Sequence, residues 1–232
     1  MNYPHTATLH THRTLARAEL VALLGGDGDG TRFEACAFDG EDLSGLDLRG
    51  AQFVDCTFSK TLLEKCNLSR THWLGCKAGE ASFHLADLTD ASLHRCDLNN
   101  TSWVKTKLAS AKFVEVKLTG AQFREARTLG LTFHESVLVG ADLKGVSFRK
   151  QTIERLNFSD ADLGGCDFRD AVFEGGSLRN ANLKNARFEG ADLRSVDLGG
   201  LTVTSLAQSF KGSVISQEQA ASLLSGLGVK VI

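Results

Sequence analysis

The chain has 232 residues, 42% of them hydrophobic, and a formal net charge of −2, which suits one or two folded domains with an apolar core. No apolar run approaches the ~18 residues that a membrane-spanning helix needs, and the first residues lack the apolar stretch of a secretory signal peptide. We therefore expect a cytoplasmic protein with no membrane contact, whose six cysteines are reduced.

Residues 1–30 precede any repeat and are expected to form a leader and a capping helix. Tyr3–His12 is polar and is expected to be poorly ordered. Leu15–Leu24 reads as a short helix with Thr14 as its N-cap, and Gly25–Gly30 ends it. We interpret this helix as a cap over the open end of a repeat structure, because solenoids need one.

Residues 31–205 repeat one five-residue phrase without a break, most clearly in Ala161–Gly200. The first residue is small, the third is Leu or Phe, and the last two are rich in turn-forming and charged residues. A straight helix or strand with this period would not keep the third residues on one face. The pattern therefore predicts a short extended piece and a turn in each pentad, with the first and third residues pointing inward. The exceptions at the centre are Trp73, Ala78, Trp103, Thr128, Ile153 and Val203.

The cysteines suggest a longer period. All six occupy the small first position, and Cys36, Cys56, Cys76 and Cys96 are spaced by twenty residues, so a coil of four pentads would stack them in one column. The spacing alone does not fix four sides. The pattern resembles the pentapeptide-repeat family, and this resemblance implies an all-β solenoid, a right-handed quadrilateral β-helix. With coils ~4.8 Å apart, residues 31–205 would form a rod of roughly 42 Å.

Some repeat positions depart from the pattern. Glu41 and Gln151 stand at inward first positions, which is costly unless they are paired or turned outward. The weakest stretch is Arg124–Leu131, where Thr128 cannot fill a site that suits Leu, so we expect a bulge or a local kink there.

Residues 206–232 leave the repeat and are expected to form a helix, a short strand and a dimer interface. Ser216 and Gln219 form a capping box, so the helix should run to about Ser225, and Val229–Ile232 looks like a short strand. The apolar side chains of this tail exceed what one coil end can cover, so we predict a homodimer in which each tail buries the other. The expected interface residues are Leu223, Leu224, Leu227, Val229 and Val231.

The tail segment QAASLLSGLGVKV is similar to the end of the quinolone-resistance (Qnr- and MfpA-type) members of that family. This resemblance implies a DNA-mimicking protein that binds DNA gyrase or topoisomerase IV and protects it from inhibitors. Two features depart from a DNA mimic: the net charge is only −2, and one side of the solenoid carries no acid between Lys107 and Lys150. The alternative is a rigid scaffold or adaptor with an unrelated protein partner.

Nothing in the sequence is typical of an enzyme. Phosphate loops, dinucleotide fingerprints and the HExxH and GxSxG patterns are missing, so we expect no catalysis and no cofactor, and we expect no binding of nucleic acid. The four-cysteine column would span ~14 Å, too far for one tetrahedral zinc site, so no metal is expected and the thiols are read as buried small hydrophobes. His72, His94 and His134 are read as surface residues, and the sequence does not predict which residues contact a partner on the repeat.

Overall fold

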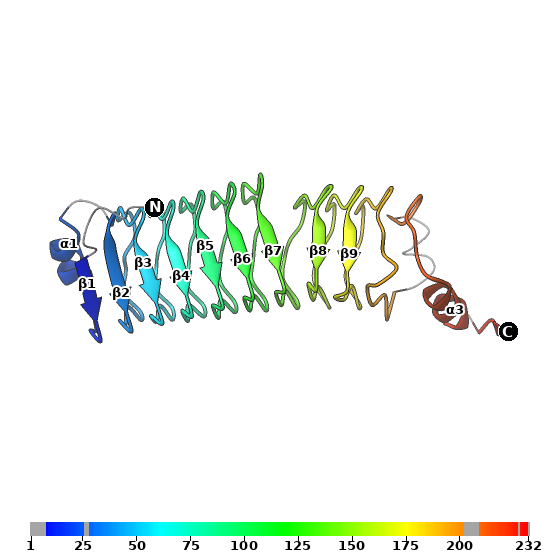
Figure 1. The fold of residues 1–232 in the computed structure, drawn as a ribbon, viewed down its shortest axis with the longest axis horizontal. Helices are drawn as coiled ribbons and strands as arrows, with labels where there is room; N and C mark the ends of the chain where they lie inside the picture. The colour runs from blue at the N-terminus through cyan, green and yellow to red at the C-terminus, as the bar shows by residue number, and fades with distance from the viewer. Residues whose placement is uncertain (1–7, 26–27, 202–208, 227, 232) are drawn as a thin grey trace, which may run out of the picture. The chain divides into compact units, whose positions relative to one another are not determined.

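The computed structural model describes residues 8–25, 28–201, 209–226 and 228–231. The chain forms two compact units, Met1–Thr132 (unit 1) and Phe133–Ile232 (unit 2). Both units are built from coils stacked in parallel, and each unit has a helix at one end of its stack (Figure 1). The expected all-β solenoid with an N-terminal and a C-terminal helix is thereby confirmed.

Among the described residues, seven regular elements lie in unit 1 and three in unit 2, while β7 (Thr132–His134) begins at the last residue of unit 1. The elements of unit 1 are β1 (Thr8–Thr11), α1 (Arg17–Leu24), β2 (Thr31–Glu34), β3 (Gln52–Val54), β4 (His72–Leu74), β5 (Ser92–His94) and β6 (Lys112–Val114). Those of unit 2 are β8 (Thr152–Glu154), β9 (Val172–Glu174) and α3 (Gln217–Ser225).

The register fixes the shape of a coil. Strands β2 to β6 pair in parallel with partners twenty residues apart, as in the pairing of Phe33 with Phe53. The other three pentads of each coil form single bridges with the same spacing. Each coil of twenty residues therefore has four sides. Representative bridges are Ala37–Thr57, Asp42–Leu62 and Asp47–Asn67 in unit 1, and Val137–Asn157, Asp142–Asp162 and Ser147–Asp167 in unit 2.

The pentad centres fill the interior, where Leu, Phe and Trp side chains are almost fully buried. Aromatic rings stack from coil to coil, with ring centroids 4.1 Å apart for Phe83 and Trp103 and 4.7 Å apart for Phe168 and Phe188. Burial of each large centre contributes ~1.5–3 kcal/mol, so the repeat supplies most of the stability of the coil stack. The indole N–H of Trp103 donates to Thr101 at 2.7 Å, which explains a threonine at that inward first position.

The fifth residue of most pentads turns the corner in the left-handed region, whether or not it is glycine. Lys60, Leu85 and Lys105 have φ values of 58°, 60° and 59°. This conformation costs a non-glycine residue ~1–2 kcal/mol, and the ladder of coil-to-coil hydrogen bonds offsets that cost, as where the Lys60 N–H donates to Gly79 at 2.9 Å. Gly176 is different, because it stands at an inward position where an added Cβ would lie 2.2 Å from the Leu156 carbonyl oxygen.

The N-terminal residues are more ordered than the sequence predicts. Thr8–Thr11 forms β1, which pairs in parallel with β2, and the His10 ring stacks on Phe33 at 5.4 Å. The expectation of disorder for Tyr3–His12 is therefore wrong for its last residues, because the first coil offers a strand edge to pair with. The earlier part of that segment lies outside the described residues.

Helix α1 begins later than predicted. Ala16, not Thr14, is its N-cap, and the Glu19 carboxylate accepts from the Ala16 N–H at 3.1 Å. Thr14 and Leu15 instead continue the extended chain, because the Leu15 N–H donates to the Ala37 carbonyl at 2.9 Å and the Leu15 side chain is buried. The predicted end at Leu24 is confirmed, with Gly25 in the left-handed region.

The irregular repeat positions have local explanations. Glu41 is half-buried and accepts from the Arg17 N–H of α1 at 2.9 Å, and Gln151 is half-buried with its amide 3.5 Å from the Ser147 carbonyl. The sequence predicts a bulge or a local kink at Arg124–Leu131. The bulge is wrong, because the backbone keeps the regular turn pattern there without an inserted residue, and the kink stays a prediction. The small side chain of Thr128 leaves that centre half-exposed instead.

The C-terminal helix agrees with the sequence, whereas the strand does not. Ser216 caps α3, since its hydroxyl accepts from the Gln219 N–H at 3.2 Å and its own N–H donates to the Gln219 side chain at 2.6 Å. Val229–Val231 forms no strand within the described residues 228–231, and the Val229 N–H instead donates to Leu224 at 3.2 Å. The last residue of the predicted strand lies outside the described residues.

Candidate functional site

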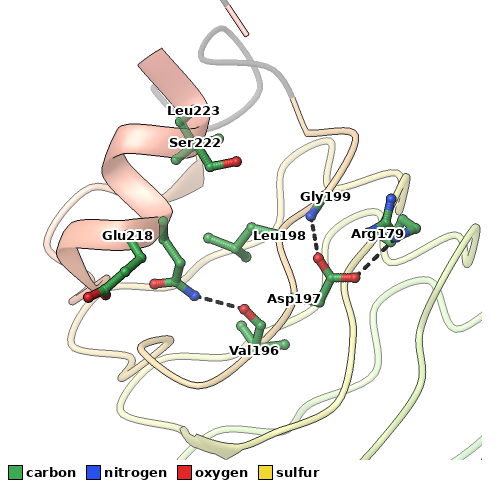
Figure 2. A pocket seen from close by; sticks show the side chains of 9 residues that line it. Arg179, Val196, Asp197, Leu198, Gly199, Glu218, Ser222 and Leu223 are labelled. Carbon is green, nitrogen blue, oxygen red and sulfur yellow. Dashed lines mark hydrogen bonds and ion pairs between the residues drawn. The ribbon is translucent and has the colours of Figure 1, made fainter. Parts of the chain in front are cut away.

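Helix α3 lies against the last complete coil of unit 2 (Figure 2). Hydrogen bonds from the Gln219 side chain hold it there. The Gln219 side-chain amide donates to the carbonyl oxygens of Leu193 and Val196, both at 2.7 Å. Its amide oxygen is already engaged by the Ser216 N–H. One side chain therefore closes the capping box and also supplies donors to two carbonyls at the end of the coil stack, where the backbone ladder would otherwise be incomplete.

A cavity of about 300 Å³ lies between part of α3 and this coil. Val196, Leu198 and Leu223 supply apolar side chains to its lining (Figure 2). At its edge, the Arg179 guanidinium pairs with the Asp197 carboxylate at 3.1 Å. The Asp197 carboxylate is thus paired, and the apolar side chains in the lining make the cavity suited to an apolar group.

The described residues of the predicted interface belong to α3 and the segment after it. Leu223 is half-buried and lines the cavity, whereas Leu224, Val229 and Val231 are 40%, 48% and 49% exposed. No residue of α3 is buried, although the helix carries an apolar stripe. Leu227 lies outside the described residues. The structure thus leaves a group of apolar side chains uncovered beside the cavity.

The cysteines are packing residues. All six are free and buried, as predicted, and their thiols lie close to backbone carbonyls, as for Cys66 with Leu43 at 3.0 Å. Burial raises the pKa of Cys66 to about 11 and that of Cys166 to about 12. The Cys66 and Cys166 thiols therefore stay protonated at neutral pH and are poor nucleophiles.

The histidines are also accounted for by local contacts. His72 is exposed and lies 2.7 Å from the Ser92 hydroxyl, and His134 lies 3.2 Å from the Glu154 carboxylate. His94 is exposed as well, whereas His134 is half-buried, so the surface interpretation is confirmed for His72 and His94. Within the described ranges, no group of three or more His, Cys, Asp or Glu residues could hold a metal ion. Nor does that part of the chain contain a helix of the length and apolarity needed to cross a membrane.

The side with the excess of basic residues is largely neutralised by ion pairs within and between coils. In unit 1, Lys107 pairs with Asp87 at 2.9 Å. In unit 2, Asp167 accepts from both Arg169 and Arg187, at 2.7 and 3.0 Å. The Arg169 hydrogen bond is the main reason why the pKa of Asp167 falls to about 2. The sequence shows the charges of this side but not their pairing, which depends on the register of the coils.

Comparison with known proteins places the chain. The sequence profile described as "Pentapeptide repeat region" matches residues 30–103, and the profile "Pentapeptide repeats (8 copies)" matches residues 91–127, 117–153 and 157–194. The chain belongs to the pentapeptide-repeat family. No curated protein sequence matched this pentapeptide-repeat protein.

Several solved structures resemble this pentapeptide-repeat protein. Full-length QnrB1, described as a plasmid-mediated fluoroquinolone resistance protein, is 22% identical over 97% of this chain and 99% of its own, with a TM-score of 0.52. A trypsin-treated QnrB1 variant gives 22% identity, 97% and 98% coverage and a TM-score of 0.53. HetL from the cyanobacterium Nostoc sp. strain PCC 7120, involved in heterocyst differentiation regulation, is 24% identical over 79% and 95% of the two chains, with a TM-score of 0.47. At this identity, the likeness to QnrB1 shows a shared fold.

Within this pentapeptide-repeat fold, the sequence missed the second role of Gln219. The capping box alone accounts for a Gln at that position, so nothing in the sequence required its contacts with Leu193 and Val196. The cavity beside α3 was also missed, because it depends on how the helix packs on the coil. The apolar stripe of the tail was the signal that could point to this end of the molecule.

Proposed function

We propose that this pentapeptide-repeat protein binds DNA gyrase or topoisomerase IV in place of a DNA segment and protects the enzyme from inhibitors such as quinolones. The observation that carries the proposal is the extent of the likeness to QnrB1, which covers nearly all of both chains. QnrB1 is described as a fluoroquinolone resistance protein. The protein acts by binding, in the cytoplasm, and catalyses no reaction.

Exposed carboxylates in the first coils of unit 1 support a DNA-like surface. Asp39 and Asp55 are exposed on the corners of neighbouring sides, and neither has an ion-pair partner within 4.0 Å among the described residues. The Asp39 carboxylate is held by the Thr57 hydroxyl at 2.6 Å and by the Ser59 N–H at 2.6 Å, which fixes its position. Fixed negative charges of this kind can replace phosphates on a positively charged DNA-binding surface.

We also propose that the protein acts as a homodimer, joined through the C-terminal end of unit 2. The uncovered side chains of Leu224, Val229 and Val231 support this, since exposed apolar groups beside a cavity are typical of an interaction surface. A two-fold axis through this end would let each chain cover the apolar surface of the other.

Supercoiling by purified gyrase in the presence of ciprofloxacin tests the main proposal. We expect the wild-type protein to restore supercoiling, and the double variant Asp39→Asn, Asp55→Asn to restore it less well, because it lacks two of the phosphate-like charges. The matched control is Asp90→Asn together with Asp160→Asn, which makes the same change of charge elsewhere. No rescue by the wild type over a wide range of protein concentrations would refute the proposal.

The alternative function is that of a rigid scaffold or adaptor for another protein. The net charge of −2 and the ion pairs of unit 2 favour it, because they leave less free negative charge than a DNA mimic uses. Affinity capture from a cell lysate with the immobilised protein separates the two functions. Recovery of a type II topoisomerase supports the main proposal, and reproducible recovery of a different protein without a topoisomerase supports the scaffold.

A further inference from the structure

In unit 1, charged residues on neighbouring coils alternate in sign, with one exception. Where charged residues stand twenty positions apart, and so lie on neighbouring coils, they are of opposite sign in almost every case. This alternation stabilises the stack, because like charges directly opposite each other on paired strands are destabilising. Within residues 28–132, Lys107 and Arg127 are the exception. The alternating pairs are Asp29–Arg49, Lys60–Glu80, Arg70–Asp90, Lys77–Asp97, Asp97–Lys117, Arg95–Glu115, Asp87–Lys107 and Lys105–Glu125.

The exception lies at a hollow in the surface. Lys107 and Arg127 form a parallel bridge, so their side chains leave adjacent coils about 4.8 Å apart at the backbone. Lys105 and Glu125 stand two residues before Lys107 and Arg127, at corner positions in the left-handed region, with φ values of 59° and 57°. These four residues and Leu85 line a cavity of about 280 Å³, which we call the basic notch.

The basic notch holds an excess of positive charge. Lys105 lies 3.8 Å from Glu125, and Lys107 lies 2.9 Å from Asp87, which is not part of the lining. Burial raises the pKa of Asp87, but hydrogen bonds from Thr89 and Lys107 outweigh it, so the pKa is lowered and the carboxylate is charged at neutral pH. The described residues offer Arg127 no carboxylate within 4.0 Å. One cation thus remains without a counterion, beside another of the same sign.

We propose that the basic notch binds a small ligand through a phosphate group. The Arg127 guanidinium offers the planar pair of donors that matches phosphate oxygens, and the two lysines add point charges. A bound phosphate would remove the repulsion between Lys107 and Arg127, which are two like charges on paired coils. The site belongs to unit 1, whereas the proposed dimer surface belongs to unit 2, and the site does not depend on the topoisomerase proposal.

The surroundings favour a small ligand over nucleic acid. A nucleic acid chain requires a row of cations along its backbone. Along this corner, the neighbours of Lys105 on the adjacent coils are instead Leu85 and Glu125, and both are part of the lining itself. The volume is at the small end of ligand sites, which suits a phosphate or pyrophosphate group more than a whole nucleotide.

Thermal unfolding in sodium pyrophosphate, compared with sodium chloride of the same ionic strength, tests this site. A ligand that binds only the folded protein raises Tm, so pyrophosphate should stabilise the wild type. Titration calorimetry with pyrophosphate should then give an affinity at least tenfold weaker for Arg127→Gln. The matched control is Arg70→Gln, which removes one exposed arginine from the alternating pair with Asp90 and should keep wild-type affinity. Equal stabilisation of the wild type by both salts, or equal losses in the two variants, would overturn the proposal.

A charge reversal provides an independent check without ligand. Arg127→Glu places opposite charges on the two coils, so in sodium chloride it should raise Tm above that of the wild type, and in pyrophosphate it should gain nothing. A Tm at or below that of the wild type in sodium chloride would show that Lys107 and Arg127 do not repel, and would remove the basis of the site. Binding of a duplex oligonucleotide that depends on Arg127, without binding of pyrophosphate, would also overturn it.

Discussion

The two terminal helices close their coils in different ways. Helix α1 is sealed onto the first coil of unit 1: Leu20 is fully buried, and the Arg17 guanidinium donates to the Asp42 carbonyl at 2.8 Å. Helix α3 satisfies the carbonyls at the end of unit 2 through Gln219, yet none of its residues is buried.

This difference separates two tasks of a solenoid cap. A cap has to satisfy the polar groups of the terminal coil, and it has to cover the apolar interior. The N-terminal cap performs both within one chain. At the C-terminal end the interior residues Leu193 and Leu198 are buried as well, but the tail that follows leaves Leu224 and Val229 exposed, which is the arrangement expected if a second chain covers them.

The largest effect on the free energy of unfolding should come from the N-terminal end, where α1 covers the first coil. Leu20→Ala removes a fully buried side chain and should lower the free energy of unfolding by ~2–5 kcal/mol, through lost burial and the cavity left behind. Urea denaturation followed by circular dichroism measures it. Val21 is 48% exposed on the same helix, so Val21→Ala should cost less than ~0.5 kcal/mol. Equal costs for the two would mean that α1 does not seal the coil.

A smaller effect is expected from Gln219→Ala. The variant loses the contacts with Leu193 and Val196 and half of the capping box, so the free energy of unfolding should fall by ~1–2 kcal/mol. The same denaturation measurement applies, with Gln217→Ala as the control because Gln217 is exposed in the first turn. If Gln217→Ala were as costly, helix propensity and not the contact with the coil would explain the loss.

Acid should weaken unit 2 through Asp167. Its pKa is lowered to about 2 from an ordinary value near 3.8, mainly by the Arg169 hydrogen bond, so its stabilising contribution is complete above about pH 4 and is lost as the pH falls toward 2. Solvent screening of the partly exposed arginines limits the loss to about 1 kcal/mol. Hydrogen exchange of the Arg187 amide, which donates to the Cys166 carbonyl at 3.0 Å, should show the loss between pH 4 and pH 2, relative to intrinsic rates. Asp167→Asn should abolish this part of the acid response, and an unchanged response would assign it to other carboxylates.

The smallest effect on folding should come from Leu224→Glu at the open end. Leu224 is 40% exposed, so the substitution should change the stability of the separated chain by less than ~0.5 kcal/mol. Its effect on assembly should be large, because a charge would then be buried between the two tails. Light scattering should give a dimer for the wild type and for the control Ser225→Glu, and a monomer for Leu224→Glu. A monomeric wild type, or a folded dimeric variant, would show that α3 is a complete cap on its own.

The repeat was predictable because each pentad carries its own structural information. A Leu or Phe centre, a small first residue and a turn residue at the end specify one side of a coil without reference to the rest of the chain, and Phe168 and its stacked neighbours are buried as expected. The twenty-residue period was weaker in the sequence, since only the cysteine spacing suggested it before the family resemblance.

The ends were harder to predict because their structure depends on what lies next to them. Thr8–Thr11 becomes a strand only because the first coil offers an edge, and Leu15 extends because Ala37 accepts its N–H. The same limit applies to the candidate sites. The charge of Arg127 is visible in the sequence, but its lack of a carboxylate among the described residues follows from the register of the coils.

The constant spacing of twenty residues also determines how the chain can acquire its structure during synthesis. Each coil pairs with segments that are only one coil away in the sequence, so no contact within the stack has to wait for a distant part of the chain. Ribosomes add ~5–20 residues per second, so a new coil can join the stack every ~1–4 seconds. The strand edge of the growing protein is thus exposed only until the next coil emerges, and this limits the time available for pairing with another nascent chain.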